Sequence, residues 1–208
     1  MHYSSIMPTK HVVKQFDVPA YYHVYNRASG ERQLFRDNED REFFVHLLQK
    51  HLRENADESD DNAEPVKTYE VKIVAYCLMG THFHLLLYQQ DDPAAITRYM
   101  RSIGTTYSMY YNRKYTSKGH VFQSSYRASH INDEAYLAHI SRYIHLNPRS
   151  YVRYAWSSYQ VYIGMRRADW VHAELVIEDA SGYAQFVKEW AEKDKRSQQN
   201  MLQDYLAL

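Results

Sequence analysis

The chain has 208 residues, of which 45% are hydrophobic and 24% charged, a composition typical of one globular domain with attached elements. Its single cysteine, Cys77, excludes a framework of intramolecular disulfides and fits a reducing compartment. The sequence contains no apolar run of about 18 residues and no N-terminal secretion signal, so we expect a cytoplasmic protein.

The charges are segregated along the chain, although 25 basic and 25 acidic residues cancel in total. Residues 98–167 hold eleven Lys or Arg and two acids, whereas residues 31–70 hold twelve acids and six bases. Such a basic segment is typical either of a nucleic-acid surface or of a solvated face. The 21 tyrosines leave a similar choice, because phenol rings stack on unpaired bases but also pack at half-buried sheet faces.

The N-terminal third predicts an arm, a strand and a helix. Residues 1–19 carry two prolines and mixed side chains, which indicates an arm that precedes the folded part. Residues 20–28, aromatic and β-branched, predict the first strand. Apolar side chains recur at helical spacing from Asn38 to about residue 54, behind an Asn/Asp capping segment. The acidic tract at about 55–68 predicts a solvated insertion.

The central part of the chain predicts a hairpin followed by two helices and a further strand. Apolar segments at 68–79 and 81–90 meet at Gly80-Thr81, which is a hairpin signal. The next expected elements are a helix at 93–115, a strand at 119–131 and a helix at 132–147 that ends before Pro148.

This order of elements predicts an α+β, ferredoxin-like fold, in which a split βαβ arrangement gives an antiparallel sheet. We expect three parts: the arm at 1–19, a main domain at 20–164 and a C-terminal extension at 165–208. The extension contains one predicted amphipathic helix, from Tyr183 to about Lys195.

Two histidines, His82 and His84, interrupt the apolar segment "THFHLLLYQQ". Residues two apart on a strand point to the same face, so the two imidazoles project side by side. Neutral imidazoles bind divalent cations, and two of them need one more protein ligand to leave positions open for phosphate or water. The alternative is a pair of hydrogen-bonded histidines without a metal. A zinc hydrolase fits less well, because no H-E-x-x-H motif is present.

The helix expected at 132–147 offers two further polar groups. Tyr143 and Asn147 are one turn apart and share a face, apart from distortion caused by the following proline. If this face covers the histidine pair, the Asn147 amide completes a metal site and the Tyr143 hydroxyl stands beside it as a candidate nucleophile. The alternative is that Tyr143 is one packed tyrosine among many.

Five segments in order resemble the REP-associated tyrosine transposases, relatives of the small single-tyrosine insertion-sequence transposases. They are "YHVYNRASGERQLF", "YCLMGTHFHLLL", "GHVFQSSYRASHI", "YLAHISRYIHLNP" and "WSSY", and they lie within residues 20–164. Where many relatives have Pro-Asn before the first histidine this chain has Gly80-Thr81, and "RSYV" replaces "VRAG" after Asn147-Pro148. Neither departure removes a candidate ligand or the nucleophile.

The resemblance implies a role for each candidate residue. His82 and His84 would be the His-hydrophobic-His ligands, Asn147 the third metal ligand and Tyr143 the nucleophile. It also implies Mg²⁺ or Mn²⁺ as the cofactor and single-stranded DNA with REP-like hairpins as the partner, cleaved and rejoined through a 5′-phosphotyrosine. The oligomeric state, monomer or homodimer, stays open.

The basic segment supplies candidate DNA contacts. We expect phosphate contacts from the basic residues that flank the second helix and the fourth strand, namely Arg98, Arg101, Arg113, Lys114 and Arg127. Tyr126 is a candidate for base stacking, whereas Tyr107 lies on an apolar stripe and is expected in the core. A base such as His139 or His145 could take the phenol proton, although both also fit a plain helix surface.

Three other functions remain open from the sequence. A protein of the same fold could bind single-stranded DNA or hairpins without catalysis. A metal-dependent phosphodiesterase could activate water in place of the tyrosine. A single-tyrosine replication initiator or relaxase would share the chemistry, although the segment "RYIHLNP" favours the transposases.

Overall fold

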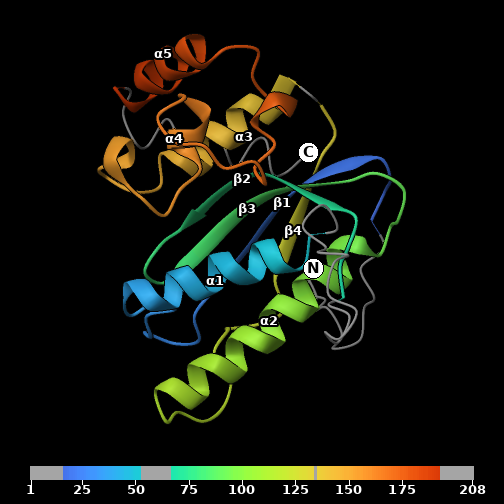
Figure 1. Ribbon diagram of the computed structural model, residues 1–208, viewed down its shortest axis with the longest axis vertical. Coiled ribbons are helices and arrows are strands. Elements are labelled where there is room, and N and C mark those ends of the chain that lie inside the picture. Colours follow the sequence, from blue (N-terminus) through green and yellow to red (C-terminus); the bar gives the residue numbers. More distant parts are fainter. Residues whose placement is uncertain (1–15, 53–66, 134, 193–208) are drawn as a thin grey trace, which may run out of the picture.

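The computed structural model describes residues 16–52, 67–133 and 135–192, and these form a four-stranded antiparallel sheet with helices on both faces (Figure 1). The strands stand in the order β2-β3-β1-β4. In chain order the elements are β1 (Ala20–Arg27), α1 (Asn38–Lys50), β2 (Val71–Leu78), β3 (His82–Gln89), α2 (Ala95–Lys114), β4 (Arg127–Ile131), α3 (Ala135–His145), α4 (Tyr159–Tyr162) and α5 (Ala180–Ala191). The predicted α+β, ferredoxin-like fold is confirmed.

The sheet is covered on both sides, which explains its nearly continuous apolar strands. Helices α1 and α2 lie on one face, and α3, α4 and α5 lie on the other (Figure 1). Val24, Phe83 and Leu85 are fully or almost fully buried in strands β1 and β3. Burying each such side chain contributes about 1.5–3 kcal/mol to folding, so the strands have little need for the polar alternation of a one-sided sheet.

The first two helices are fixed to each other at the start of α1. Asp37 caps α1 by accepting a hydrogen bond from the backbone N–H of Asp40. At the C-terminal end of α2, the Lys114 ammonium lies 2.9–3.0 Å from carboxylate oxygens of Asp37, Glu39 and Asp40. Tyr107 is buried in the same interface, where its hydroxyl donates to the backbone carbonyl of Leu34. The expectation that Tyr107 belongs to the core is confirmed.

The hairpin turn between β2 and β3 is held by the segment before α1. The carbonyl of Gly80 accepts hydrogen bonds from the backbone N–H groups of Leu34 and Phe35. A Cβ atom at position 80 would lie 2.5 Å from the side-chain oxygen of Gln33. That contact is with the end of a flexible side chain, so the two backbone hydrogen bonds to Gly80 are what hold this turn, next to the first histidine of β3.

The predicted fourth strand is too long by eight residues. Only Arg127–Ile131 forms a strand, and it pairs with the first half of β1. Before it, Gly119 has a positive φ of 90°, and the chain meets the end of β1 through single contacts, among them a bridge between Ala28 and Phe122 and a hydrogen bond from the Gln123 N–H to the Arg27 carbonyl. The apolar residues of this segment mimic a strand pattern, but they pack as a loop beside the end of the sheet.

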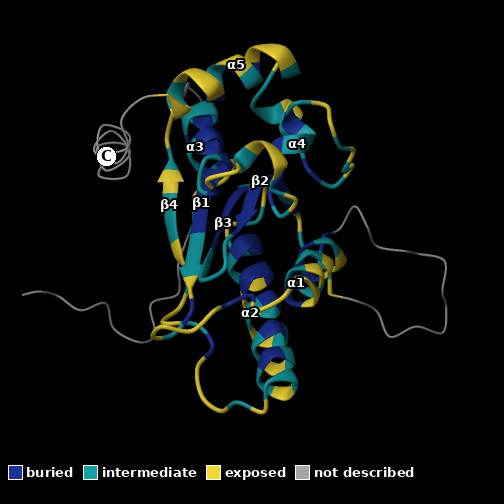
Figure 2. Cartoon of the chain, turned by 90° about the vertical axis from the view of Figure 1, so that its left-hand side faces the viewer, coloured by how far each residue is buried: buried dark blue, intermediate teal, exposed yellow. Residues whose placement is uncertain are grey.

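The chain after α3 packs back onto that helix. His145 is fully buried, with Nδ1 2.7 Å from the Tyr183 hydroxyl of α5 and Nε2 2.8 Å from the Ser158 hydroxyl. Arg142 lies between the rings of Phe186 and Trp190, 3.8 and 3.9 Å from their centroids. These contacts make a brace between α3 and α5, and Figure 2 shows its buried interior.

Some of the predicted segments lie partly or wholly outside the described residues. Helix α5 (Ala180–Ala191) begins three residues before the predicted start. The acidic insertion lies outside the described residues except for its last two positions, and so does most of the predicted arm. The domain boundaries at 19/20 and 164/165 stay predictions. Within the described ranges, no helix has the length and apolar character needed to cross a membrane.

Candidate functional site

The two histidines of β3 lie under helix α3, on the sheet face away from α1 and α2. His84 stands opposite Tyr25 of β1 and Cys77 of β2, and His82 stands opposite Arg27. The two imidazoles are perpendicular, with centroids 5.1 Å apart, and His84 is only 6% exposed. The prediction that both side chains project to one face of the strand is confirmed.

Helix α3 carries Tyr143 to this face and ends at His145, so Asn147 lies two residues past the helix and not in its last turn as predicted. Asn147 Oδ1 lies 3.5 Å from His82 Nε2, while its amide nitrogen donates to the backbone carbonyl of Tyr143. The Tyr143 ring meets His84 edge-on, with centroids 5.5 Å apart. The structure therefore brings together His82, His84, Tyr143 and Asn147, which are far apart in the sequence.

Burial decides the protonation of these groups. It lowers the pKa of His84 well below the usual 6.5, with smaller contributions from His23 and His82. Burial also lowers the pKa of His82, reinforced by Arg27 and opposed by the Asn147 amide. Both imidazoles are therefore neutral at neutral pH, the form in which their nitrogens can bind a cation.

The Tyr143 phenol is held in its protonated form. Burial raises its pKa above 10, Tyr25 raises it further, and the Asn147 amide acts in the opposite direction. A phenol in this state is a poor nucleophile until its proton leaves during attack.

The donor set suits a weakly held divalent cation. No three His, Cys, Asp or Glu are grouped for metal binding within the part of the chain that the structure describes. Two neutral imidazoles and one amide oxygen, as in His82, His84 and Asn147, would therefore leave several positions to water and phosphate. These residues fit Mg²⁺ or Mn²⁺ only in the presence of an anionic ligand, because they contribute no negative charge themselves.

One residue of this site, His23, was missed by sequence reasoning. It is fully buried in β1, and its Nε2 lies 2.9 Å from Nδ1 of His84. Its ring also meets Tyr143 edge-on, with centroids 6.0 Å apart. The predicted fold could have pointed to His23, because a ferredoxin-like fold places the first strand, which carries His23, next to the strand of the histidine pair.

A hollow of about 480 Å³ opens beside the histidines, at the end of the sheet. It is lined by Tyr25, Asn26, Arg27, Thr81, His82, Phe83, His84, Gln123, Ser124 and Arg127. Both arginines are exposed there, so the hollow has a basic edge next to the site. Arg127 was predicted as a phosphate contact, whereas Arg27 was not, because it lies in the first strand, outside the basic segment 98–167.

The other predicted DNA contacts lie on or against α2, on the opposite face of the sheet (Figure 1). Lys114 is paired with three carboxylates, which disfavours a phosphate contact, and its role in DNA binding stays a prediction. Arg98 forms an ion pair with Asp92. Tyr126 is half-buried, with its hydroxyl 3.3 Å from that of Thr97 in α2. Arg101 and Arg113 are exposed on α2 and stay predictions.

Neither histidine suggested as a base for Tyr143 is placed for that role. Both ring nitrogens of His145 are engaged in the brace between α3 and α5. His139 accepts from Arg142 and packs against Phe186 and Trp190. His145 lies two residues after Tyr143 and so points to another side of α3, whereas the ring of His139 is held against Phe186 and Trp190 of α5.

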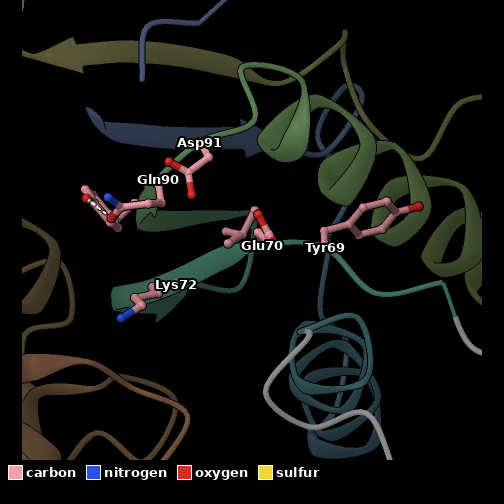
Figure 3. A pocket seen from close by; sticks show the side chains of 7 residues that line it. Tyr69, Glu70, Lys72, Gln90 and Asp91 are labelled. Carbon is pink, nitrogen blue, oxygen red and sulfur yellow. Dashed lines mark hydrogen bonds between the residues drawn. The ribbon is translucent and has the colours of Figure 1, made fainter. Parts of the chain in front are cut away.

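A second hollow, of about 340 Å³, lies at the other end of the β2–β3 hairpin (Figure 3). Glu70, Lys72, Gln90 and Asp91 surround it, so its charges are mixed. None of the predicted site residues lines this hollow, and it does not belong to the site on α3.

The fold and the grouped side chains define a class: a ferredoxin-like protein with a His-hydrophobic-His pair facing a tyrosine on a covering helix. Comparison with protein families matches residues 18–147 to the family described as "Transposase IS200 like". The chain therefore belongs to the IS200-like transposase family, and the resemblance seen in the sequence is confirmed at this level.

A solved structure, that of a REP-associated tyrosine transposase bound to a REP hairpin, is similar in fold. The TM-score is 0.57 at 13% sequence identity, and the similarity covers 82% of this chain and 94% of the other. None of the curated proteins compared with the sequence matches it.

Proposed function

We propose that the protein cleaves and rejoins single-stranded DNA next to hairpin-forming, REP-like sequences, with Tyr143 as the nucleophile. The observation that carries this proposal is the packing of Tyr143 against His84, while Asn147, two residues after the end of that helix, reaches His82. Membership in a transposase family and a fold similar to a hairpin-bound relative support it.

In the proposed reaction, the phenol oxygen of Tyr143 bonds to phosphorus of the scissile phosphodiester as the bond to the 3′ oxygen breaks. The phenol gives up its proton, the released 3′ oxygen becomes a hydroxyl, and DNA stays attached as a 5′-phosphotyrosine. A later 3′-hydroxyl can reverse this step without ATP, because the covalent link is still a phosphodiester. This chemistry suits strand transfer better than degradation.

His82, His84 and Asn147 would hold Mg²⁺ or Mn²⁺, which when bound polarises the phosphate for attack. The neutral imidazoles and the amide position the phosphate beside Tyr143, and the basic edge formed by Arg27 and Arg127 neutralises the adjoining backbone. Because the protein ligands carry no charge, Mn²⁺ affinity is expected to be low without DNA and to rise when DNA is added. Electron paramagnetic resonance of free Mn²⁺ measures both states.

The proposal is tested on a denaturing gel with a labelled hairpin oligonucleotide that carries single-stranded flanks, in Mg²⁺ or Mn²⁺. Wild type should give a covalent protein–DNA band that depends on the metal, and Tyr143→Phe should give none. Tyr136→Phe, on the same helix but without a contact to the histidine pair, is the matched control and should keep the band.

The other two outcomes select the competing functions. Cleavage that survives in Tyr143→Phe without a covalent band would favour a phosphodiesterase that activates water. A hairpin that shifts on a native gel and is never cut, in either metal and with several flanks, would favour a binding protein without catalysis.

A further inference from the structure

The imidazoles of the site are each held through Nδ1. His82 Nδ1 lies 3.0 Å from the Thr81 hydroxyl, and His84 Nδ1 lies 2.9 Å from Nε2 of His23. No hydrogen bond reaches Nε2 of His84 within the described ranges, and His82 Nε2 meets only Asn147 Oδ1. Both histidines are thus arranged to offer Nε2 as the ligand atom.

This arrangement fixes where the protons must be. A neutral imidazole carries one proton, so a histidine that binds a cation through Nε2 must carry its proton on Nδ1. His84 Nδ1–H must then donate to His23, and Nε2 of His23 must accept. The remaining proton of His23 lies on its own Nδ1.

Nδ1 of His23 is a buried atom with no hydrogen-bond partner in the described part of the chain. A buried unpaired N–H is unfavourable, and such groups in folded proteins call for a functional explanation. The opposite arrangement, in which His23 donates from Nε2, avoids the unpaired N–H but leaves the proton of His84 on Nε2. That proton would block ligation by His84.

We propose that His23 is a positioning residue that accepts a hydrogen bond from Nδ1–H of His84 and so keeps Nε2 of His84 available as a ligand atom. The rings of His23 and His84 are nearly parallel, with centroids 5.1 Å apart and 17° between their planes, so the contact also fixes the orientation of His84. Thr81 contacts His82 in the equivalent way. The inference rests on the metal-dependent function proposed above, and it extends that site into β1.

The test compares His23→Leu, which removes the acceptor, with His23→Gln, whose side-chain oxygen can replace it. Both are made with Tyr143→Phe, so that DNA is not consumed, and Mn²⁺ binding is measured by electron paramagnetic resonance with a single-stranded hairpin oligonucleotide present. We expect His23→Leu to bind Mn²⁺ about 10–100-fold more weakly, as is typical when the partner of a ligating histidine is lost. His23→Gln should recover most of the affinity.

His130→Gln is the matched control, since His130 of β4 stacks on Tyr22, whose side chain lies on the other face of the sheet. It should bind Mn²⁺ like the parent protein. Equal Mn²⁺ affinity of the Leu variant and the parent, with both folded by circular dichroism, would overturn the inference.

A nuclear magnetic resonance measurement that needs no DNA cleavage tests this inference separately from the proposed function. Long-range ¹H–¹⁵N spectra report the tautomer of each imidazole, and variants assign the signals. We expect the Nδ1–H tautomer for His84, lost in His23→Leu and kept in His23→Gln. If the protein neither binds Mn²⁺ nor cuts DNA, the proposed function fails, and the tautomer of His84 still decides the role of His23. An Nε2–H tautomer for His84 in the parent would contradict it.

Discussion

Tyr143 and His145 lie two residues apart on α3 and face opposite environments. Tyr143 meets the histidine pair of the sheet, whereas His145 is enclosed by the hydroxyls of Tyr183 and Ser158. Helical geometry produces this division, because a step of two residues turns the side chain to the other side of the helix. One helix therefore serves both the site and the brace.

The buried His145 makes stability depend on pH. Burial lowers the pKa of His145 from 6.5 to about 3. Below pH 6.5 this histidine is therefore protonated in the unfolded chain but stays neutral in the folded chain. The contribution of His145 to the free energy of unfolding is complete above pH 6.5 and falls as the pH decreases to about 3. Near pH 5 the loss is about 2 kcal/mol. His23 acts with the same sign, since burial lowers its pKa to about 4.

This pH dependence is checked by urea unfolding of wild type and His145→Gln across the same pH range. The difference in unfolding free energy between the two proteins should shrink as the pH falls below 6.5, because only wild type carries the His145 contribution. Parallel curves for the two proteins would show that His145 is not buried in neutral form.

At the scale of elements, α5 restrains the helix that carries the nucleophile. Tyr183 joins His145 to Ser141, whose hydroxyl lies 2.9 Å from the phenol oxygen. The phenol is fully buried, and burial raises its pKa above the usual 10, so it acts here as a neutral hydrogen-bonding group. A charged contact, Arg142 between Phe186 and Trp190, strengthens the same interface.

Removing one hydroxyl from this brace should be costly. Tyr183→Phe leaves Nδ1 of His145 without its partner and is expected to lower the free energy of unfolding by about 1–3 kcal/mol. Urea unfolding measures the change, and Tyr151→Phe, whose ring packs on Tyr159 but whose hydroxyl makes no hydrogen bond within the described residues, should change it by less than about 0.5 kcal/mol. Equal effects of the two substitutions would show that the brace does not stabilise α3.

At the scale of the whole molecule, the neutral total charge conceals two basic surfaces on different sides. One is the edge formed by Arg27 and Arg127 beside the site, and the other is the exposed side of α2, which carries Arg101 and Arg113. The sheet separates them, so a short single strand that enters the site meets the first surface directly. The site edge is therefore the stronger candidate for DNA binding.

Salt dependence distinguishes these surfaces. Each phosphate contact that is lost should reduce the slope of log affinity against log salt by about one, so Arg27→Ala and Arg127→Ala should each flatten it. Arg113→Ala should change it less, as measured by fluorescence anisotropy with a single-stranded hairpin oligonucleotide. A larger effect of Arg113→Ala than of both site-edge variants would place the DNA along α2 instead.

Much of the site could be predicted from the sequence because it follows local periodicity. The strand period places His82 and His84 on one face, and the helix period aligns Tyr143 with Asn147. That the helix face covers the histidine pair was a condition of the prediction, and the packing of Tyr143 on His84 meets it. What local patterns could not show was the ion pairing of Lys114, since its three carboxylates come from α1, more than 70 positions away.

Two features were predicted wrongly or missed, the length of the fourth strand and the role of His23, and both depend on contacts between segments distant in the sequence. The residues before β4 have strand-like composition, but they meet the end of β1 through single contacts and do not continue the β1–β4 ladder, which stops at Tyr25 and Arg127. His23 resembled an ordinary member of an aromatic strand until its neighbour across the sheet was known. The role inferred for His23 depends on its contact with His84, which belongs to a different strand.

If Tyr143 is the nucleophile, it becomes covalently attached to DNA, and peptide mapping of the adduct identifies the attached residue. Trypsin releases residues 143–149, in which Tyr143 is the only tyrosine, and separates them from the peptide that carries Tyr136. After reaction with a hairpin oligonucleotide and nuclease trimming, mass spectrometry should find the phosphonucleotide on the peptide 143–149. An adduct on any other tyrosine peptide, or cleaved DNA without an adduct on the protein, would contradict the account.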